Sequence, residues 1–285
     1  MDAKKIRRSN GMVWSFKMGQ MVSFLIHIGD RLNLFATLLR ASMEAGLAVT
    51  TDELVATTGY DRRWLMEWLR GMAAAKVLEY KEGDDNTERF HLSPEMGEVL
   101  VNESTSLTYA AGAFVGMADR ELSEGIVNAF RTGVGMSYRA RSLAGGEDGP
   151  LQTARLLGAW TRIALVPQII ARLGNGAITS CLEKGGSVLD MGCGAGIGVV
   201  EMARAFPRSR VHGVDPDKTA LQVARKQAAA EGILNCEFTE AKGEELEGEA
   251  LYDFAVCLDI VHDCPFPDRI LSTLCRLLKR KHSDQ

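Results

Sequence analysis

A short apolar run that breaks into a glycine-punctuated loop is the feature of this chain that most restricts its fold. Residues 187–198 read S-V-L-D-M-G-C-G-A-G-I-G. Val188 and Leu189 are typical of the end of a buried strand, and residues 199–206 have the pattern of a following helix. A strand, a tight glycine loop and a helix open a nucleotide-type cofactor site, because backbone without Cβ atoms lets a ligand lie against the main chain.

The spacing of the glycines separates two classes of cofactor. A dinucleotide fingerprint needs a small residue at the position of Ile197, so that pattern fails. What remains is an acid, Asp190, two residues before the first of three alternating glycines, Gly192, Gly194 and Gly196. A carboxylate at that place repels a pyrophosphate and suits a ligand that carries an ammonium and a sulfonium.

These residues resemble motif I of the class I S-adenosylmethionine-dependent methyltransferases. The resemblance continues in residues 210–215, R-V-H-G-V-D, a second short strand that ends in an acid. Its spacing from the glycine loop is close to that of the acid that binds the ribose hydroxyls in doubly wound folds. The resemblance implies that Asp190 binds the amino group of S-adenosylmethionine, that Asp215 binds the ribose diol, and that the glycines allow close backbone approach. The alternative is a glycine-rich turn and a strand-end acid in another α/β fold.

The rest of the C-terminal part, residues 181–285, alternates strands and helices. A helix is expected over residues 217–231, and further strands over residues 236–239 and 252–258. This alternation predicts an α/β fold with a Rossmann-like, doubly wound parallel sheet. A ligand should lie at the carboxyl ends of the strands, between the first and the fourth. Asp190 lies at this edge, and the segment after residue 258 begins there.

That segment, residues 259–265, reads D-I-V-H-D-C-P. It resembles the His-Asp pair that follows the fourth strand in plant-type small-molecule O-methyltransferases. The resemblance implies that His262 is the general base; we expect Asp263 to orient it and Asp259 to contact the cofactor. Histidine titrates in the range useful for removing a proton from an acceptor hydroxyl. The alternative is a loop histidine that only packs beside the cofactor.

Residues 1–93 predict a basic N-terminus, an amphipathic helix over residues 12–28 and a winged-helix domain. Three helices are expected near residues 32–39, 51–58 and 61–72, followed by extended pieces at 77–80 and 89–92. We expect the third helix to bury one broad face, made of Trp64, Leu65, Trp68, Leu69 and Met72.

A winged helix raises the question of DNA binding. Arg62, Arg63 and Arg70 lie outside the expected core face of the third helix and are balanced by Glu67, which is thin support for several phosphate contacts. The similar methyltransferases use this domain to dimerise and to close the substrate pocket. We therefore expect a homodimer, a small-molecule methyl acceptor and no nucleic acid.

Residues 94–180 predict a helical connector that contributes to the substrate pocket. Ser93 and Pro94 are typical of a helix start, and helical patterning covers residues 107–130 and 151–173. Tyr138, in the glycine-interrupted loop between them, is a candidate for the substrate pocket. The alternative is a buried tyrosine whose hydroxyl is satisfied by the protein.

Composition restricts the partners, the metal sites and the location expected for the protein. A formal net charge of −4 gives no general attraction to nucleic acid or to an anionic membrane. The six cysteines contain no C-x-x-C pair, so no metal site and no redox motif is expected. No secretory signal precedes them, which predicts reduced thiols in a cytoplasmic protein.

Two departures from the family pattern stand out. A lysine, Lys242, lies near the place where relatives carry an acid that binds adenine. The resemblance also implies three more strands after the helix over residues 269–279, where the sequence instead reads R-K-H-S-D-Q to its end. We expect a C-terminally truncated sheet of about four strands whose fourth strand is an unpaired apolar edge. A cofactor-sensing winged-helix regulator and a non-catalytic interaction protein therefore remain alternatives to an active enzyme.

Overall fold

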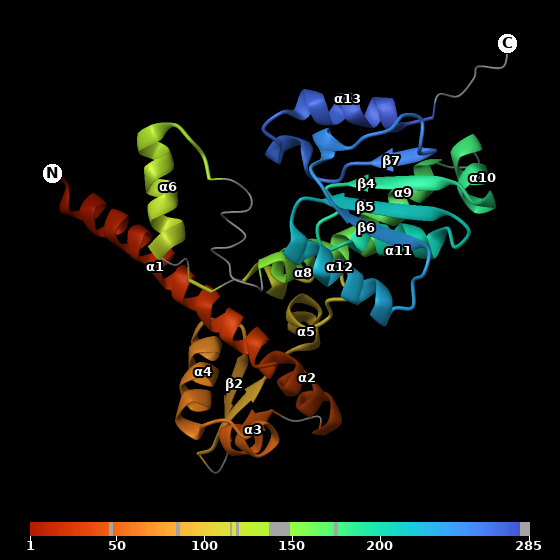
Figure 1. Ribbon diagram of the computed structural model, residues 1–285. Coiled ribbons are helices and arrows are strands. Elements are labelled where there is room, and N and C mark those ends of the chain that lie inside the picture. The colour runs from red at the N-terminus through yellow and green to blue at the C-terminus, as the bar shows by residue number, and fades with distance from the viewer. Residues whose placement is uncertain are drawn as a thin grey trace. The chain divides into compact units, whose positions relative to one another are not determined.

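The chain forms two compact units, residues 1–118 and 119–285, each of which is described by itself. The computed structural model describes residues 1–45, 48–83, 86–114, 116–117, 120–136, 149–173 and 176–279. Figure 1 labels their helices and strands.

The first unit contains helices and one small antiparallel sheet. Its main helices are α1 (Ala3–Arg31), α2 (Leu34–Ala45), α3 (Thr51–Thr58), α4 (Arg62–Ala74) and α5 (Pro94–Leu100). The sheet has the order β1 (Val49–Thr50), β3 (Glu88–His91), β2 (Glu79–Glu82). The three helices and the hairpin confirm the winged-helix prediction, and β1 is an added third strand, too short to carry a sequence pattern of its own.

The helix ends of this unit follow the expected capping chemistry. Thr50 and Glu53 form a reciprocal capping box at the start of α3, and Gly59 ends that helix with a φ of 72°. The Asp61 side chain accepts hydrogen bonds from two backbone N–H groups in the first turn of α4. Ser93 caps α5 in the same way.

The core of the first unit joins α2, α3 and α4 to the sheet. Leu65, Trp68, Leu69 and Met72 are buried on one face of α4 as predicted, but Trp64 is 75% exposed, so its assignment to the core was wrong. The four buried positions form a stripe centred between Leu65 and Met72, and Trp64 lies about 90° around the helix from that centre, at the edge of the stripe and in the first turn of α4. The Trp68 indole Nε1 donates to the Leu25 carbonyl at 2.9 Å, which ties α4 to α1.

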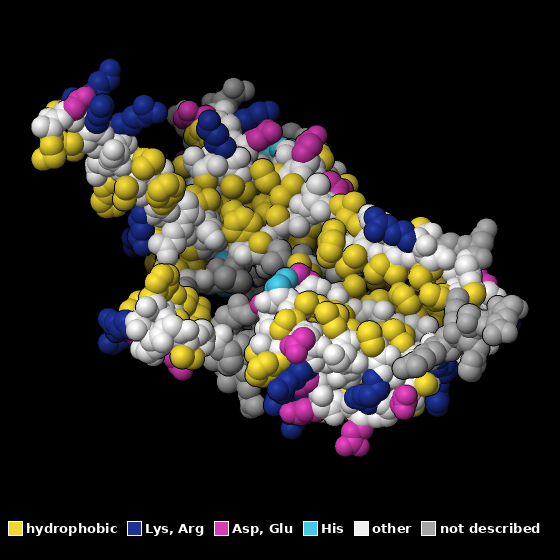
Figure 2. Space-filling model, turned by 90° about the horizontal axis from the view of Figure 1, so that it is seen from above, with side chains coloured by type: hydrophobic (Ala, Val, Ile, Leu, Met, Phe, Trp, Pro, Cys, Tyr) yellow, Lys and Arg dark blue, Asp and Glu magenta, His cyan; other side chains and the backbone are white. Residues whose placement is uncertain are grey.

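Helix α1 is longer than the sequence predicted. It has 29 residues, because the Asp2 side chain caps it ahead of the basic cluster. Its second half is anchored at Gly29, where an added Cβ would lie 2.5 Å from the Trp68 ring and 2.6 Å from the Phe35 ring. Its first half exposes large apolar side chains, seen behind the basic tip at the upper left of Figure 2: Met12, Val13, Trp14, Phe16 and Met18.

No single helix in the described parts of the chain is long and apolar enough to cross a bilayer. Helix α1 and the first part of α2 meet the length and hydropathy only when they are joined across a bend of 70°.

The predicted helical patterning over residues 107–130 was wrong in its first half. The structure has a short 3₁₀ turn at Ala111–Ala113, and helix α6 spans Arg120–Thr132. The Ser106 hydroxyl accepts a hydrogen bond from the Thr108 backbone N–H at 3.2 Å and contacts the Thr108 hydroxyl at 2.8 Å. Such side-chain bonds to nearby backbone compete with helix formation.

The second unit contains the predicted parallel sheet. Its strands are β4 (Ser187–Met191), β5 (Arg210–Asp215), β6 (Cys236–Glu240) and β7 (Phe254–Val256), in the order β6-β5-β4-β7. All neighbouring pairs are parallel. The strand order reverses beside β4, which pairs with β5 on one side and with β7 on the other. This is the place where ligands bind in open α/β sheets.

Helices cover the two faces of this sheet unequally. On one face lie α11 (Ile197–Ala205) and α12 (Lys218–Ala230) with α8 (Gly149–Trp160), a π-helical turn at Thr161–Leu165, α9 (Val166–Leu173) and α10 (Ala177–Lys184). On the other face lies α13 (Pro267–Leu277) (Figure 1). Because successive side chains of a strand point to opposite faces, the first face buries Val188 and Val211 and the second buries Leu189 and Val214.

A polar group occupies the second face beside α13. The His212 ring contacts the Tyr252 hydroxyl at 2.6 Å through Nδ1 and the Thr239 hydroxyl at 2.8 Å through Nε2. Burial lowers the pKa of His212, and Glu237 opposes that shift. The two hydroxyls therefore satisfy the polar atoms of the His212 ring on a part of the sheet that no described helix covers.

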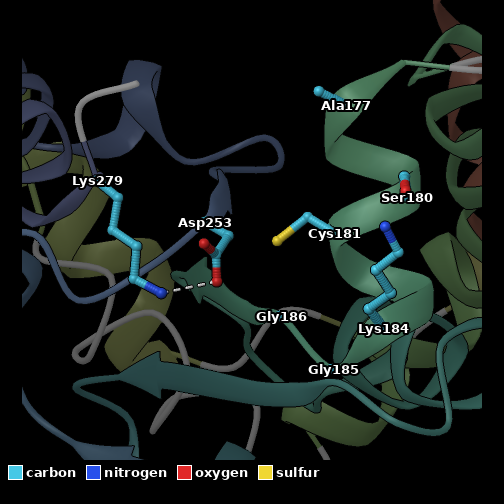
Figure 3. Close-up of a pocket in the computed structure, with 8 residues that line it drawn as sticks. All are labelled: Ala177, Ser180, Cys181, Lys184, Gly185, Gly186, Asp253 and Lys279. Carbon is cyan, nitrogen blue, oxygen red and sulfur yellow. Dashed lines mark hydrogen bonds and ion pairs between the residues drawn. The ribbon is translucent and has the colours of Figure 1, made fainter. Parts of the chain in front are cut away.

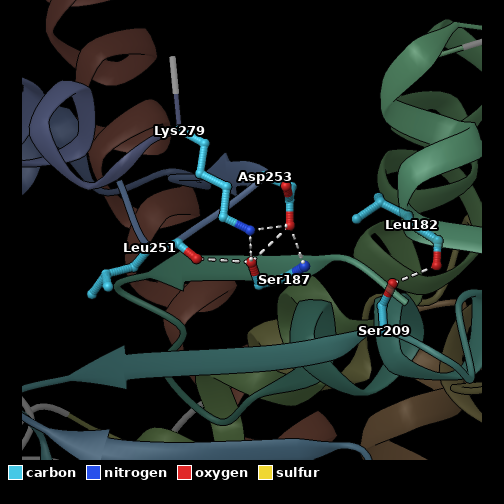
Figure 4. Close-up of polar contacts among 6 residues, drawn as sticks. All are labelled: Leu182, Ser187, Ser209, Leu251, Asp253 and Lys279. Atoms are coloured by element: carbon cyan, nitrogen blue, oxygen red, sulfur yellow. Dashed lines mark hydrogen bonds and ion pairs between the residues drawn. The ribbon is translucent and has the colours of Figure 1, made fainter. Parts of the chain in front are cut away.

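The outer edge of β7 is covered at its start, so the prediction of a wholly unpaired edge was wrong there. Leu278 forms a parallel bridge with Tyr252, and the Lys279 N–H donates to the Tyr252 carbonyl at 2.8 Å. The Lys279 ammonium also contacts Asp253, which accepts hydrogen bonds from the Ser187 backbone N–H and hydroxyl, each at 2.8 Å (Figure 4). Burial raises the pKa of Asp253, but the Lys279 and Ser187 hydrogen bonds outweigh it and bring that pKa to about 2.

Candidate cofactor site

The loop between β4 and α11 takes a backbone course that favours glycine at three positions. Gly192, Gly194 and Gly196 have φ values of 78°, 51° and 77°. An added Cβ at Gly192 would lie 2.5 Å from the Ile260 side chain, and one at Gly196 would lie 2.6 Å from the Ala224 Cβ. At Gly194 it would meet nothing within 4 Å. The first and third glycines therefore serve packing within the protein, and Gly194 is the one that faces open space.

Asp190, the fourth residue of β4, has the most unusual environment in this unit. The residue is 2% exposed, and its Oδ1 atom accepts no hydrogen bond from any described residue. Burial and, to a smaller extent, the nearby Asp215 carboxylate together raise the pKa of the Asp190 carboxyl to about 7. A buried oxygen without a donor costs free energy, so this site fits a ligand that brings a positively charged donor.

Asp215, the last residue of β5, holds the glycine loop in place. Its Oδ2 accepts a hydrogen bond from the Gly194 backbone N–H at 2.8 Å, and its Oδ1 accepts one from the Asp217 N–H at 2.8 Å. Burial raises the pKa of Asp215, and these two hydrogen bonds oppose the rise. Each carboxylate oxygen keeps a second lone pair, which leaves capacity to accept from a hydroxyl.

The segment after β7 packs against the same loop. Asp259 has a φ of 59°, and the next side chain, Ile260, lies against Gly192. His262 follows in a short 3₁₀ turn and is 65% exposed. Its Nδ1 lies 3.6 Å from Asp259 Oδ1, and its Nε2 lies 3.8 Å from Asp263 Oδ2. The tertiary structure thus brings this segment to the glycine loop and sets the histidine between two carboxylates.

Two contacts of the site were missed by sequence reasoning. Ile260 fills the space beside Gly192, and Gly198, in the first turn of α11, leaves room for the Asp190 carboxylate. A fourth glycine inside a helix was the available signal, because glycine is a poor helix former. Tyr138, the predicted substrate-pocket residue, lies outside the described residues.

A hollow of about 600 Å³ lies at the opposite end of β4 and does not include any of these residues. Figure 3 shows Cys181, on α10, pointing toward the Asp253–Lys279 pair, with Lys184 further along the same helix. Because its charged groups are already paired or exposed, we assign the candidate site to the glycine loop. In the described part of the chain, no group of three His, Cys, Asp or Glu side chains could hold a metal ion.

Comparison with known families agrees with this geometry. Residues 188–281 match a methyltransferase domain, and residues 20–102 match an Rv2258c-like winged helix-turn-helix domain. The chain thus carries a methyltransferase domain behind a winged-helix domain. Its cofactor domain contains the glycine loop and both buried acids, and its winged-helix domain contains α4 and the hairpin.

Curated relatives match about a third of the chain. The chain is 33% identical over 96 residues to the ubiquinone biosynthesis O-methyltransferase of Shewanella sp. strain ANA-3, which is 33% of this chain and 40% of that protein. It is 36% identical over 97 residues to the enzyme of the same name from Acinetobacter baylyi, with the same coverage of 33% and 40%. The chain therefore spans about two fifths of the length of these relatives.

Solved structures share the fold over nearly the whole methyltransferase chain. The mitomycin 7-O-methyltransferase aligns with a TM-score of 0.68 at 18% identity, over 98% of this chain and 79% of that one. Human N-acetylserotonin methyltransferase, solved in complex with S-adenosylmethionine, aligns with a TM-score of 0.67 at 15% identity, over 95% and 77%. These likenesses concern the fold alone.

The raised pKa of Asp190 predicts a pH dependence of the ligand-free protein. Below about pH 4 the carboxyl is protonated in both the folded and the unfolded state. Between pH 4 and about pH 7 the unfolded chain loses this proton while the folded protein keeps it, so the stability falls as the pH rises. Asp190→Asn removes this contribution.

Urea unfolding of the wild type and of Asp190→Asn at several pH values between 4 and 8 measures the difference. We expect the free energy of unfolding of the wild type to fall relative to the variant up to about pH 7 and then to level off. Parallel pH profiles for the two proteins would contradict the assignment of a buried, proton-holding carboxyl.

Proposed function

We propose that this protein transfers the methyl group of S-adenosylmethionine to a hydroxyl group of a small-molecule acceptor. The observation that carries the proposal is the buried Asp190 Oδ1 atom, which no described residue supplies with a hydrogen-bond donor, next to a glycine loop with one open side. The names of the curated relatives, which are O-methyltransferases, support oxygen as the accepting atom.

The proposed cofactor contacts follow from the chemistry of each group. Asp190 would accept from the amino group of the methionine part, and its partnerless Oδ1 supports that role. Asp215 would accept from the ribose hydroxyls with its free lone pairs. Gly194 would let the backbone approach the cofactor, and Gly192 and Gly196 would hold the loop in the required course. Asp259, at the start of the segment that packs on this loop, would contact the cofactor from the side of β7.

His262 is the proposed general base. Bound cofactor supplies a methyl group on a sulfonium, which is open to in-line displacement by an aligned nucleophile. The imidazole would take the proton of the acceptor hydroxyl as the new O–CH₃ bond forms and the S–CH₃ bond breaks. Asp263 and Asp259, at 3.8 Å and 3.6 Å, would stabilise the imidazolium and orient the ring.

A homodimer is proposed from the surface of α1. Val13 and Trp14 are neighbours in sequence and both exposed, so their side chains leave the helix about 100° apart. A partner with a flat surface would cover only one of these two sides of the helix. A second copy of the chain can cover both sides. Large exposed apolar surfaces mark such interaction sites.

The arginines of the same unit give little support for binding of nucleic acid. Arg62 pairs with Asp52, and Arg70 pairs with Glu88 at 2.9 Å, so two of the three arginines on α4 face carboxylates of their own chain. We therefore propose a structural role for residues 1–93, a connecting role for residues 94–180 and cofactor binding for residues 181–285. The six free thiols support a cytoplasmic setting.

Calorimetric titration with S-adenosylhomocysteine tests the cofactor assignment. We expect the wild type to bind and Asp190→Asn to bind at least about tenfold more weakly, because the amide cannot neutralise an ammonium. The affinity of the wild type should rise between pH 5 and about pH 7, as the Asp190 carboxyl loses its proton. Asp61→Asn, which changes a helix cap in the other unit, should bind as the wild type does. No binding by the wild type would refute the proposed function.

Transfer of a labelled methyl group to a panel of phenols and catechols tests the base. His262→Ala should reduce turnover by about a hundredfold or more while leaving the affinity for S-adenosylhomocysteine unchanged. His91→Ala, on strand β3, is the control for loss of a histidine. Turnover by His262→Ala equal to that of the wild type would remove the general-base role and leave cofactor binding intact.

Sedimentation velocity tests the dimer. We expect the wild type to sediment as a dimer and the double variant Trp14→Ser/Phe16→Ser to sediment as a monomer, because both replacements remove apolar area from the exposed part of α1. Leu234→Ser, at a residue 93% exposed in the other unit, is the matched control. A wild type that is monomeric at micromolar concentration would contradict the proposal.

A further inference from the structure

We infer that Gly198 is a positioning residue that sets where the Asp190 carboxylate lies. This inference rests on the proposed function, in which the Asp190 carboxylate accepts a hydrogen bond from the cofactor. It concerns a glycine of helix α11, not one of the three loop glycines before it.

Gly198 lies beside the carboxylate and leaves room for it. An added Cβ at Gly198 would lie 2.8 Å from Asp190 Oδ2 and 3.9 Å from Asp190 Cγ. The same Cβ would lie 3.3 Å from Leu258 Cδ1. The carboxylate therefore occupies space that any other residue at position 198 would fill with its own side chain.

The backbone at this position does not itself require glycine. Gly198 is the second residue of α11 and has no left-handed φ, unlike Gly192, Gly194 and Gly196. Glycine destabilises a helix relative to alanine, so a helical backbone by itself favours the larger residue. The contact with Asp190 is what gives glycine an advantage here.

The carboxylate has little freedom to move away from a methyl group at position 198. Asp190 is 2% exposed, and Leu258 approaches the same space from the strand β7 side. A methyl group would push Oδ2 by several tenths of an ångström and would displace the acceptor that the proposed ammonium needs. Small misplacements of a positioned group have large effects on binding and rate.

Gly198→Ala should therefore separate stability from cofactor affinity. We expect its affinity for S-adenosylhomocysteine to fall at least about tenfold, while its thermal unfolding temperature changes little, because the helix preference of alanine offsets the cost of crowding Asp190. Gly19→Ala is the matched control, because Gly19 lies in helix α1 and an added Cβ there meets nothing within 4 Å. That variant should gain the same helix preference and keep full affinity.

Two further variants trace the effect to Asp190. In a double-mutant cycle, Gly198→Ala should lower affinity much less in the Asp190→Asn background than in the wild type, because the charge it displaces is already absent. Leu258→Val shortens the neighbouring side chain and should restore part of the affinity, or of the folding if Gly198→Ala alone folds poorly. Full affinity in Gly198→Ala, or an equal loss in both backgrounds, would overturn the inference.

The pH dependence of unfolding distinguishes this inference from the proposed function. If the wild type does not bind S-adenosylhomocysteine, the proposed function fails. The unfolding of the ligand-free protein then still tests the contact between Gly198 and Asp190. Gly198→Ala should move the pH at which the Asp190-dependent loss of stability levels off, whereas Gly19→Ala should not. An unchanged pH profile in Gly198→Ala would overturn the positioning role.

Discussion

The second unit is organised around one buried carboxylate, Asp190, whose Oδ1 atom receives no hydrogen bond from any described residue. A carboxylate taken out of water without a partner is costly, so the folded protein holds Asp190 with a raised pKa of about 7. The sheet tolerates this because β4 is its central strand, paired with β5 and β7, and its neighbours supply the burial free energy. An unfavourable group kept inside a well-packed sheet is typical of a binding site.

The surroundings of that carboxylate are held by the protein before any ligand arrives. Asp215 fixes the glycine loop by accepting a hydrogen bond from the Gly194 N–H, and Ile260 packs against Gly192 from the segment after β7. Backbone groups that are fixed in advance need not be ordered when a ligand binds, which increases its affinity. The same packing joins the proposed base segment to the loop, so the proposed cofactor binding and proton removal would depend on one set of contacts.

The first unit has a different physical character. Its helices and hairpin bury a conventional apolar core, yet half of α1 exposes tryptophan, phenylalanine and methionine side chains. The arginines of α4 that could have approached phosphates are largely engaged with Asp52 and Glu88. Apolar exposure on a helix and paired charges on another favour association with protein over association with nucleic acid.

The sequence by itself determined the glycine loop, the two strand-end acids, the helix caps and the succession of strands and helices, because these depend on residues close together along the chain. Only the tertiary structure decided that Trp64 is exposed, that Leu278 pairs with Tyr252 and that Gly198 makes room for Asp190. Each of those depends on distances between segments far apart in sequence, and a local pattern carries periodicity and propensity but no distance across the fold. The partnerless state of the Asp190 oxygen is the strongest example, since a motif places an acid at a strand end but does not reveal which donors reach it.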